Sequence, residues 1–200
     1  MATVQHSTLT GADSHEPKGV STAPEGTFYV SDGAGSGSWK YIPTGWGQYK
    51  DDGSPQVFNT VAARLQNDGA SVSSVTDHLP FEIRGTGQLW DTTNDKITPV
   101  SPFDTYNIRL DLPVTAKSGA PSSLKVVLDI GGAAGITIPI VSSEISVNAT
   151  PPYTLSAGFT VYTGTTFKAN GGQFFLSSDT GTVTVTNPSI IIDMSHNGDL

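Results

Sequence analysis

The sequence predicts an all-β protein in which an extended N-terminal arm precedes an antiparallel β-sandwich or jelly roll. From about residue 80 onward, short segments alternate apolar and polar residues, which is the period of a half-buried strand. Gly, Pro and Asn turns separate these segments at intervals of about ten residues. The 200 residues include 22 glycines and 13 prolines, and only 36% are hydrophobic. This composition favours many turns and argues against a helical bundle.

The arm is expected to cover residues 1–45. Within it, Pro17 and Gly19 favour turns, because proline fixes φ and glycine tolerates positive φ. Residues 26–33 are the one strand-like run, and residues 33–39 form a Gly- and Ser-rich tract that ends at a tryptophan. Such a block cannot bury a core of its own. We therefore expect its order to come from a partner surface or from other copies of the chain.

Residues 46–55 read as a linker, and residues 56–200 as the sandwich. The segment 54–69 fits two alternatives. Ser54 and Pro55 suit the cap and first position of a helix that would end at Gly69. The same segment also suits the first strand of the sandwich, and we favour the strand because everything after it is β.

Two segments of the sandwich show their buried faces clearly. The run "YNIRLDL" places four apolar side chains on one face of a strand, and "LKVVLDI" does the same. These predicted core residues are Tyr106, Ile108, Leu110, Leu112, Leu124, Val126, Leu128 and Ile130. The runs "ITIPIV", "YTLSAGFTVYTG", "GQFFLSS", "GTVTVT" and "SIIID" follow as further strands.

Charge and cysteine content restrict the class of partner. The net charge is −8 and the isoelectric point about 4.7, with no basic cluster. Because phosphate contacts need Lys and Arg, we expect no nucleic-acid binding. We see no apolar run of about 20 residues and no apolar leader, so we expect no membrane span and no secretion signal. The absence of cysteine suits synthesis in the cytoplasm.

No catalytic or metal-binding motif is found. The four histidines lack metal-ligand spacing, and no G-x-S-x-G elbow occurs. No two carboxylates can be paired from the sequence alone, and we expect Asp111 and Asp129 to face water on the polar sides of their strands. The carboxylates considered for a glycosidase pair are Asp91, Asp95, Asp111, Asp129 and Glu144. The sequence therefore predicts a protein that is not an enzyme and has no cofactor.

Aromatic residues cluster after the Gly-rich tract. Tyr41, Trp46 and Tyr49 follow Trp39 closely, and Trp90 stands further along the chain. Exposed aromatic side chains mark interaction sites, and Trp and Tyr are also enriched in protein interfaces. We therefore treat Tyr41, Trp46, Tyr49 and Trp90 as candidate interface or glycan-contacting residues, with ordinary core positions as the alternative.

The opening stretch "HSTLTGADSHEPKGVSTAPEGTFYVSDGAGSGSW" resembles an N-terminal module of structural proteins of tailed bacteriophages. The pattern is H…LTG…HEPKG, a spacer of small residues, and then GT-x-YV-x-DG-x-GSG-x-W, over about 35 residues. Residues 79–200 are similar to jelly-roll modules, remotely like C1q or tumour necrosis factor, that end phage fibres and head decorations. Such modules are commonly trimeric.

This resemblance implies a virion surface protein that is made in the host cytoplasm and is homotrimeric. It would be a head-decoration (cement) or head-fibre protein that binds the major capsid protein or another virion protein through its arm. A short tail fibre that contacts host glycans is the alternative. The anchoring residues implied by the motif are His15, Glu16, Pro17, Lys18, Gly19, Tyr29, Asp32, Gly33, Gly35 and Trp39.

Overall fold

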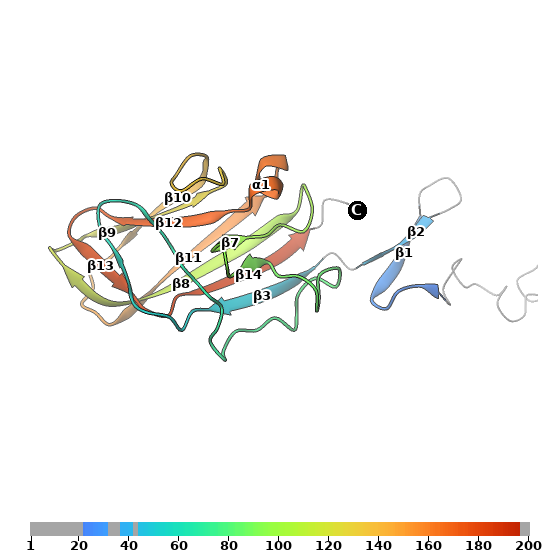
Figure 1. The fold of residues 1–200 in the computed structure, drawn as a ribbon, viewed down its shortest axis with the longest axis horizontal. Coiled ribbons are helices and arrows are strands. Elements are labelled where there is room, and N and C mark those ends of the chain that lie inside the picture. The colour runs from blue at the N-terminus through green and yellow to red at the C-terminus, as the bar shows by residue number, and fades with distance from the viewer. Residues whose placement is uncertain (1–21, 32–36, 42–43, 197–200) are drawn as a thin grey trace, which may run out of the picture. The chain divides into compact units, whose positions relative to one another are not determined.

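The computed structural model describes residues 22–31, 37–41 and 44–196. The chain divides into two compact units between Ile42 and Pro43. The first unit contains a β-hairpin, and the second is a β-sandwich (Figure 1). In the hairpin, β1 (Thr27–Ser31) pairs with β2 (Gly37–Tyr41). The strand predicted near residue 30 is present, but the last residues of the Gly-rich tract, from Gly37 to Trp39, belong to a second strand that the sequence did not suggest.

The sandwich consists of two main antiparallel sheets. The larger has the order β3-β14-β8-β13-β4 with β11 paired to β8, and the smaller has the order β10-β9-β12-β5. The strands of the larger sheet are β3 (Gly45–Lys50), β4 (Gln56–Phe58), β8 (Thr105–Ser118), β11 (Tyr153–Tyr162), β13 (Thr182–Val185) and β14 (Ser189–His196). Those of the smaller are β5 (Ala63–Arg64), β9 (Ser123–Asp129), β10 (Pro139–Ser146) and β12 (Gln173–Ser178).

Three short elements complete the sandwich unit. The strands β6 (Trp90–Asp91) and β7 (Lys96–Ile97) form a two-stranded ribbon, and α1 (Thr165–Asn170) is a single short helix. No helix among the described residues is long and apolar enough to cross a membrane. The fold confirms the predicted all-β antiparallel, jelly-roll-like sandwich.

The core lies between the two sheets and uses the faces that the sequence alternation predicted. All eight predicted core residues of β8 and the β9 region are buried, and the apolar side chains of β12, β13 and β14 pack against them. The segment 54–69 contains β4 and β5 and no helix, so the favoured strand alternative holds. The two-residue alternation was sufficient to predict these buried faces, because each sheet of the sandwich buries one of its faces.

Two predictions about this unit are wrong. Residues 46–50 of the predicted linker 46–55 belong to a strand, because β3 pairs with β14 along six residue positions from Gly45↔Met194 to Lys50↔Ser189. Asp129 does not face water: it is buried and accepts backbone hydrogen bonds from Thr137 at 2.6 Å and Ile138 at 2.5 Å. The Asp129 carboxylate thus ties the loop after β9 to the start of β10.

Two turns meet at a pair of glycines at one end of the sandwich. Gly119 and Gly181 have φ values of 75° and 58°, in the left-handed region that favours glycine. A Cβ atom on Gly181 would lie 2.8 Å from the Gly119 Cα and would also meet the carbonyl oxygen of Ser118. These two positions therefore need glycine for both backbone conformation and space.

The alternation of buried and exposed residues along β8 leads to a prediction about stability. Replacing the fully buried Leu110 by Asp places an unpaired charge in the core. We expect a loss of about 5 kcal/mol or more, comparable with the whole stability of a domain. Thermal unfolding followed by circular dichroism measures the effect. Val72→Asp, at a fully exposed position, is the control and should leave the melting temperature nearly unchanged.

Asp179 predicts how stability varies with pH. Its carboxylate accepts hydrogen bonds from the Ser122 hydroxyl and from the backbone N–H groups of Ser122, Ser123 and Thr180, and these lower its pKa from 3.8 to about 2. A lowered pKa stabilises the fold above the unfolded-state value, and this contribution disappears as the pH falls through about 2.

Asp179→Asn should therefore lower the melting temperature at neutral pH, and the difference from the wild type should shrink as the pH falls from about 4 to about 2. Melting curves across this range check it. Asp77→Asn removes the same charge at another exposed turn and should show no such trend. A difference between Asp179→Asn and the wild type that stayed constant over the whole range would contradict the assigned role.

Candidate interaction surfaces

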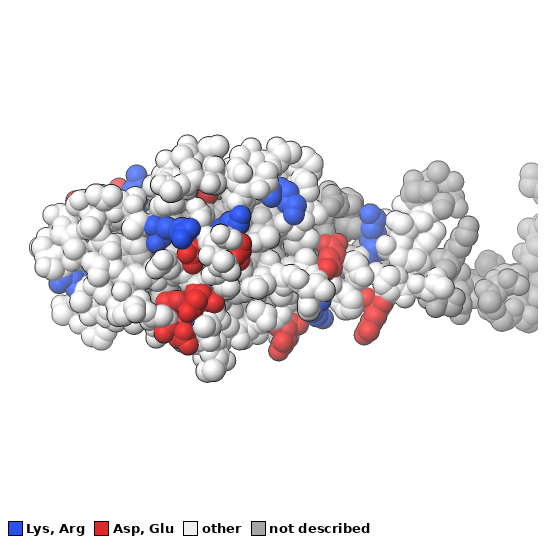
Figure 2. Space-filling model, in the orientation of Figure 1, with Lys and Arg blue, Asp and Glu red and all other residues white. Residues whose placement is uncertain are grey.

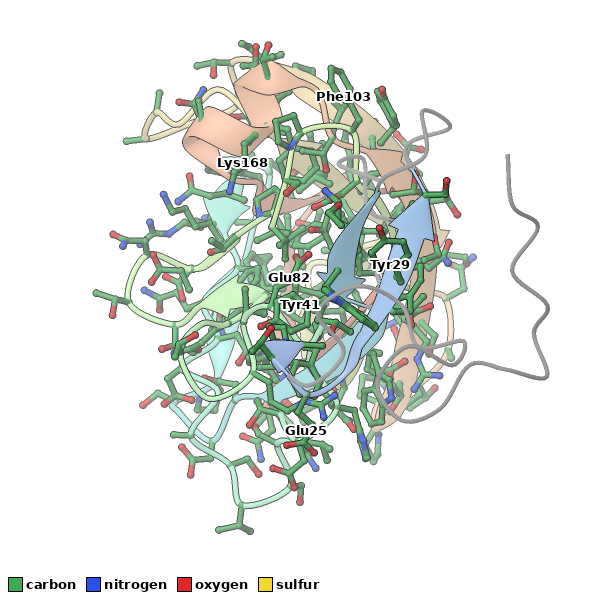
Figure 3. The ribbon with its side chains drawn as sticks, turned by 90° about the vertical axis from the view of Figure 1, so that its right-hand side faces the viewer. Glu25, Tyr29, Tyr41, Glu82, Phe103 and Lys168 are labelled. Carbon is green, nitrogen blue, oxygen red and sulfur yellow. The ribbon has the colours of Figure 1, made fainter. Side chains whose placement is uncertain are left out.

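The hairpin gathers three aromatic residues on one face. Tyr29 lies opposite Trp39, and Thr27 lies opposite Tyr41. Residues directly opposite share a face, as do residues two apart in a strand, so Tyr29, Trp39 and Tyr41 lie on the same face. Tyr29 and Tyr41 are labelled on the two strands in Figure 3. Phe28 belongs to the other face of the hairpin.

Gly37 provides the space for this aromatic face. A Cβ atom at Gly37 would lie 2.8 Å from Cε1 of Tyr29 and would meet the carbonyl oxygen of Val30. The Tyr29 ring therefore lies over the glycine, and it also makes an edge contact with Trp39, with ring centroids 5.4 Å apart and an interplanar angle of 70°. This arrangement fixes two of the predicted anchoring residues against each other.

The other predicted anchoring residues lie outside the part of the chain that the structure describes. They are His15, Glu16, Pro17, Lys18, Gly19, Asp32, Gly33 and Gly35. The anchoring role that the phage-like motif implies for these residues, and for Tyr29 and Trp39, stays a prediction. Tyr41, one of the predicted interface or glycan-contacting residues, shares the face of Tyr29 and Trp39.

Two of the remaining aromatic candidates are core residues and not surface contacts. Trp90 has 0% exposure, and its indole N–H donates to the Asn67 carbonyl oxygen at 2.8 Å. Tyr49 has 2% exposure, and its hydroxyl accepts the backbone N–H of Leu89 at 2.9 Å. Both side chains are fixed inside the monomer, so neither is available to a glycan or another subunit. Trp46 is half-buried and stacks on His78, with centroids 5.1 Å apart.

The structure instead exposes a pair of aromatic rings that were not among the candidates predicted from the sequence. Phe103 and Tyr162 lie with ring centroids 5.9 Å apart, and both rings are largely accessible to solvent. The alternation along β11 already places Tyr162 on the outer face of its sheet. Phe103 belongs to a loop before β8, where no periodic pattern indicates which way a side chain points.

A polar groove of about 860 Å³ runs beside β4 and β5. Its lining includes Asp51, Asp68, Asp95 and Arg64. Arg64 forms an ion pair with Asp95, with 3.2 Å between the guanidinium nitrogen and the carboxylate oxygen. Figure 2 shows that acidic and basic groups lie next to each other on one face of the molecule, while most of that surface carries no charge.

The carboxylates of this groove hold the backbone in place. Asp95 accepts the N–H of Asn67 at 2.9 Å, and Asp51 accepts the N–H of Asp68 at 3.2 Å. Burial raises the pKa of Asp51 and of Asp95, whereas the N–H of Ala70 helps to lower the pKa of Asp68. Across the described residues, no group of three His, Asp or Glu side chains is arranged to hold a metal ion. Asp95 thus joins Asn67 to the turn of the β6–β7 ribbon, and Asp51 joins Asp68 to the end of β3.

The sequence matches no family model, and no curated protein matches it. Among solved structures, the chain is similar to PRD1 vertex protein P5, with 13% identity and a TM-score of 0.45 over 86% of this chain and 83% of that chain. It is also similar to the Eiger TNF from S. frugiperda, with 9% identity and a TM-score of 0.41 over 78% of this chain and 96% of that chain.

A family 35 carbohydrate binding module from Clostridium thermocellum matches with 10% identity and a TM-score of 0.29, over 72% of this chain and 96% of that chain. The chain thus resembles a viral vertex protein and a TNF-like protein only weakly. All three TM-scores are below 0.5, and the three proteins differ in kind, so we infer nothing about function from them.

The packing of Tyr29 on Gly37 predicts the effect of a substitution in the hairpin. Gly37→Val should break the hairpin, because the new side chain meets the Val30 carbonyl oxygen and displaces the Tyr29 ring. Loss of the nuclear Overhauser contacts between the Tyr29 and Trp39 rings is the measurement. The melting temperature of the sandwich should not change. Ser38→Val, on the opposite face of the same strand, should keep these contacts, and their persistence in Gly37→Val would refute the packing role.

Proposed function

We propose that this chain is a structural protein of a bacteriophage virion, and specifically a decoration (cement) or head-fibre protein of the capsid surface. In this proposal, the first 42 residues bind the major capsid protein or another virion protein, and the sandwich projects outward. The observation that carries it is the phage-like motif of the N-terminal unit, which ends in a hairpin with Tyr29, Trp39 and Tyr41 on one face.

The hairpin has the properties of a docking element. An isolated two-stranded hairpin is marginally stable in water, so a partner surface would add to its stability. Tyr and Trp are also the residues that contribute most to binding when they are enclosed in an interface. Docking of this aromatic face onto the capsid would therefore stabilise the hairpin and attach the chain in one step.

Trimerisation would strengthen this attachment. We propose a homotrimer, in which three N-terminal units would reach three equivalent sites on the particle. Once one unit is bound, the others act at a high effective concentration, so three weak contacts give a tight attachment. A protein that binds only the assembled shell shifts the equilibrium toward assembly, which is how decoration would stabilise the capsid.

The proposal assigns the chain no catalytic activity, no cofactor and no nucleic-acid partner. The net charge of −8 disfavours contact with phosphate backbones. The polar groups of the groove beside β4 and β5 are used in hydrogen bonds and an ion pair that stabilise the fold. The chain would therefore act through its surfaces and its attachment alone.

Attachment is tested with purified virions of the phage that encodes this chain, stripped of the protein and mixed with recombinant versions. We expect the full chain to sediment with the particles, and a version without residues 1–42 to remain in the supernatant as a folded sandwich. Tyr29→Ser combined with Trp39→Ser should weaken attachment at least about tenfold, because two interface aromatics are lost. Val72→Ser on the sandwich is the control and should attach normally.

Location is tested by electron microscopy of the decorated particles. Density spread over the head supports the proposal. Density at the tail alone contradicts a capsid decoration protein and favours a short tail fibre. Full attachment of the version without residues 1–42 contradicts the anchoring role of the N-terminal unit.

A further inference from the structure

We propose that the outer face of the larger sheet carries a carbohydrate-binding site, formed by the Phe103–Tyr162 aromatic pair and the shallow hollow next to it, whose lining combines apolar and polar groups. The ligand class is an uncharged hexopyranose, free or at the end of a glycan. The site uses none of the residues of the N-terminal unit, so a test of sugar binding does not depend on the attachment proposed above.

The aromatic pair forms a platform on the surface of the sandwich. Phe103 is 48% exposed and Tyr162 is 60% exposed. Their ring planes are tilted by 30°, with centroids 5.9 Å apart, so the two rings form one contiguous apolar element that remains accessible to solvent. Figure 3 looks onto the end of the sandwich that carries Phe103 together with Lys168 of α1. A platform of two rings matches the apolar C–H face of one sugar ring.

The backbone of Phe103 is strained in a way that burial of its ring does not compensate. Its φ of 70° lies in the left-handed region, which is rare for a bulky side chain. Strain of this kind persists where the surrounding structure enforces it, and it concentrates at functional sites. Here the strained residue presents its ring to solvent, so the core gains little from the conformation.

Hydrogen bonds on both sides of Phe103 enforce that conformation. Its N–H donates to the Thr163 carbonyl oxygen at 2.6 Å, and the N–H of Thr163 donates to the Asp104 carbonyl oxygen at 2.8 Å. The buried Asp104 carboxylate accepts both the Ser101 N–H and the Tyr106 hydroxyl at 2.6 Å. The platform is therefore held in place before any ligand arrives, which lowers the entropic cost of binding.

A hollow of about 330 Å³ lies along the same face as Tyr162. Thr160 and Gly158 precede Tyr162 at two-residue steps in β11, so all three point to the outer face. A Cβ atom at Gly158 would meet nothing within 4 Å, so this glycine leaves the floor of the hollow open. The side of the hollow opposite β11 is lined by Asn107, Arg109, Ile191 and Asp193.

The groups around this hollow suit a neutral, hydroxyl-rich ligand. Asn107 and Thr160 lie opposite each other and are joined by a hydrogen bond of 2.9 Å, which orients both. Arg109 is held by Asp111 through contacts of 3.1 and 2.8 Å, and its charge is largely balanced. With the Asp193 carboxylate on the same lining, an anionic ligand is disfavoured. Amide, hydroxyl, guanidinium and carboxylate groups together can donate to and accept from sugar hydroxyls.

The size of the site favours a sugar over a protein partner. A stable protein interface buries about 800 Å² on each side and has an apolar centre surrounded by a polar rim. The Phe103–Tyr162 pair is a single small apolar element beside a hollow that is lined by both apolar and polar groups. A hollow of about 330 Å³ falls at the lower end of the range for small-ligand sites, about 300–1,000 Å³.

The test uses the full chain and a panel of soluble probes: the methyl glycosides of glucose, galactose, mannose and N-acetylglucosamine, and their short oligomers. Saturation-transfer difference NMR detects binding, and calorimetry gives the affinity. We expect at least one probe to bind with its C–H protons most strongly saturated. Tyr162→Ala and Phe103→Gly should each weaken binding about tenfold or more, since each removes half of the platform.

Phe103→Gly separates binding from folding. Glycine adopts positive φ readily, so this variant should keep the wild-type melting temperature while it loses affinity. Ile138→Ala, which removes a side chain of similar exposure elsewhere, is the control and should bind like the wild type.

Three results would overturn the proposal. The first is the failure of every probe to bind the wild-type chain at millimolar concentration. The second is unchanged affinity in both platform variants. The third is a change of assembly state for Tyr162→Ala in analytical ultracentrifugation, which would make the aromatic pair an interface between copies of the chain.

Discussion

The strict alternation along β8 is the constraint on which the rest of the sandwich depends. Tyr106, Ile108, Leu110, Leu112 and Val114 all point into the core, and this one strand pairs with β11, β13 and β14. A shift of register by one residue would turn this apolar row toward water and reverse both faces of the larger sheet. The same alternation therefore also fixes the opposite face, where Asn107 and Arg109 line the hollow beside Tyr162.

The parts of the fold that follow this two-residue period were predictable from the sequence, and the parts that depend on tertiary pairing were not. The strand β3 escaped prediction because Gly47 occupies an inward position and leaves Tyr49 as the one large apolar side chain on that face. Its neighbour β14 supplies the pairing that makes it a strand. Asp129 reads as a surface residue by charge, yet the backbone N–H groups of Thr137 and Ile138 satisfy it inside the protein. Sequence alone does not place such donors.

The candidate surfaces, like the fold, were predictable from the sequence only in part. The sequence indicated that aromatic residues of the N-terminal unit contact a partner, but only the register of the hairpin shows that Tyr29, Trp39 and Tyr41 share a face. For the sandwich, the aromatic residues selected from the sequence included Tyr49 and Trp90, which are core residues with satisfied polar atoms. A tyrosine or tryptophan in a turn-rich sequence fits a core and an interface equally well, because each has an apolar body and a polar tip.

Phe103 illustrates why the remaining surface lay beyond a sequence argument. A phenylalanine has no intrinsic preference for positive φ, so its conformation depends on the surrounding hydrogen bonds, including the bond to the carbonyl oxygen of Thr163, which is distant in the chain. The strained conformation lowers the stability of the folded state, and the exposed ring contributes little packing energy that would offset this loss. In the proposed carbohydrate site, the ring held in this conformation would contact a ligand outside the chain. The two proposed surfaces therefore differ: the hairpin would gain stability from a partner, whereas hydrogen bonds within the sandwich already hold the Phe103 backbone.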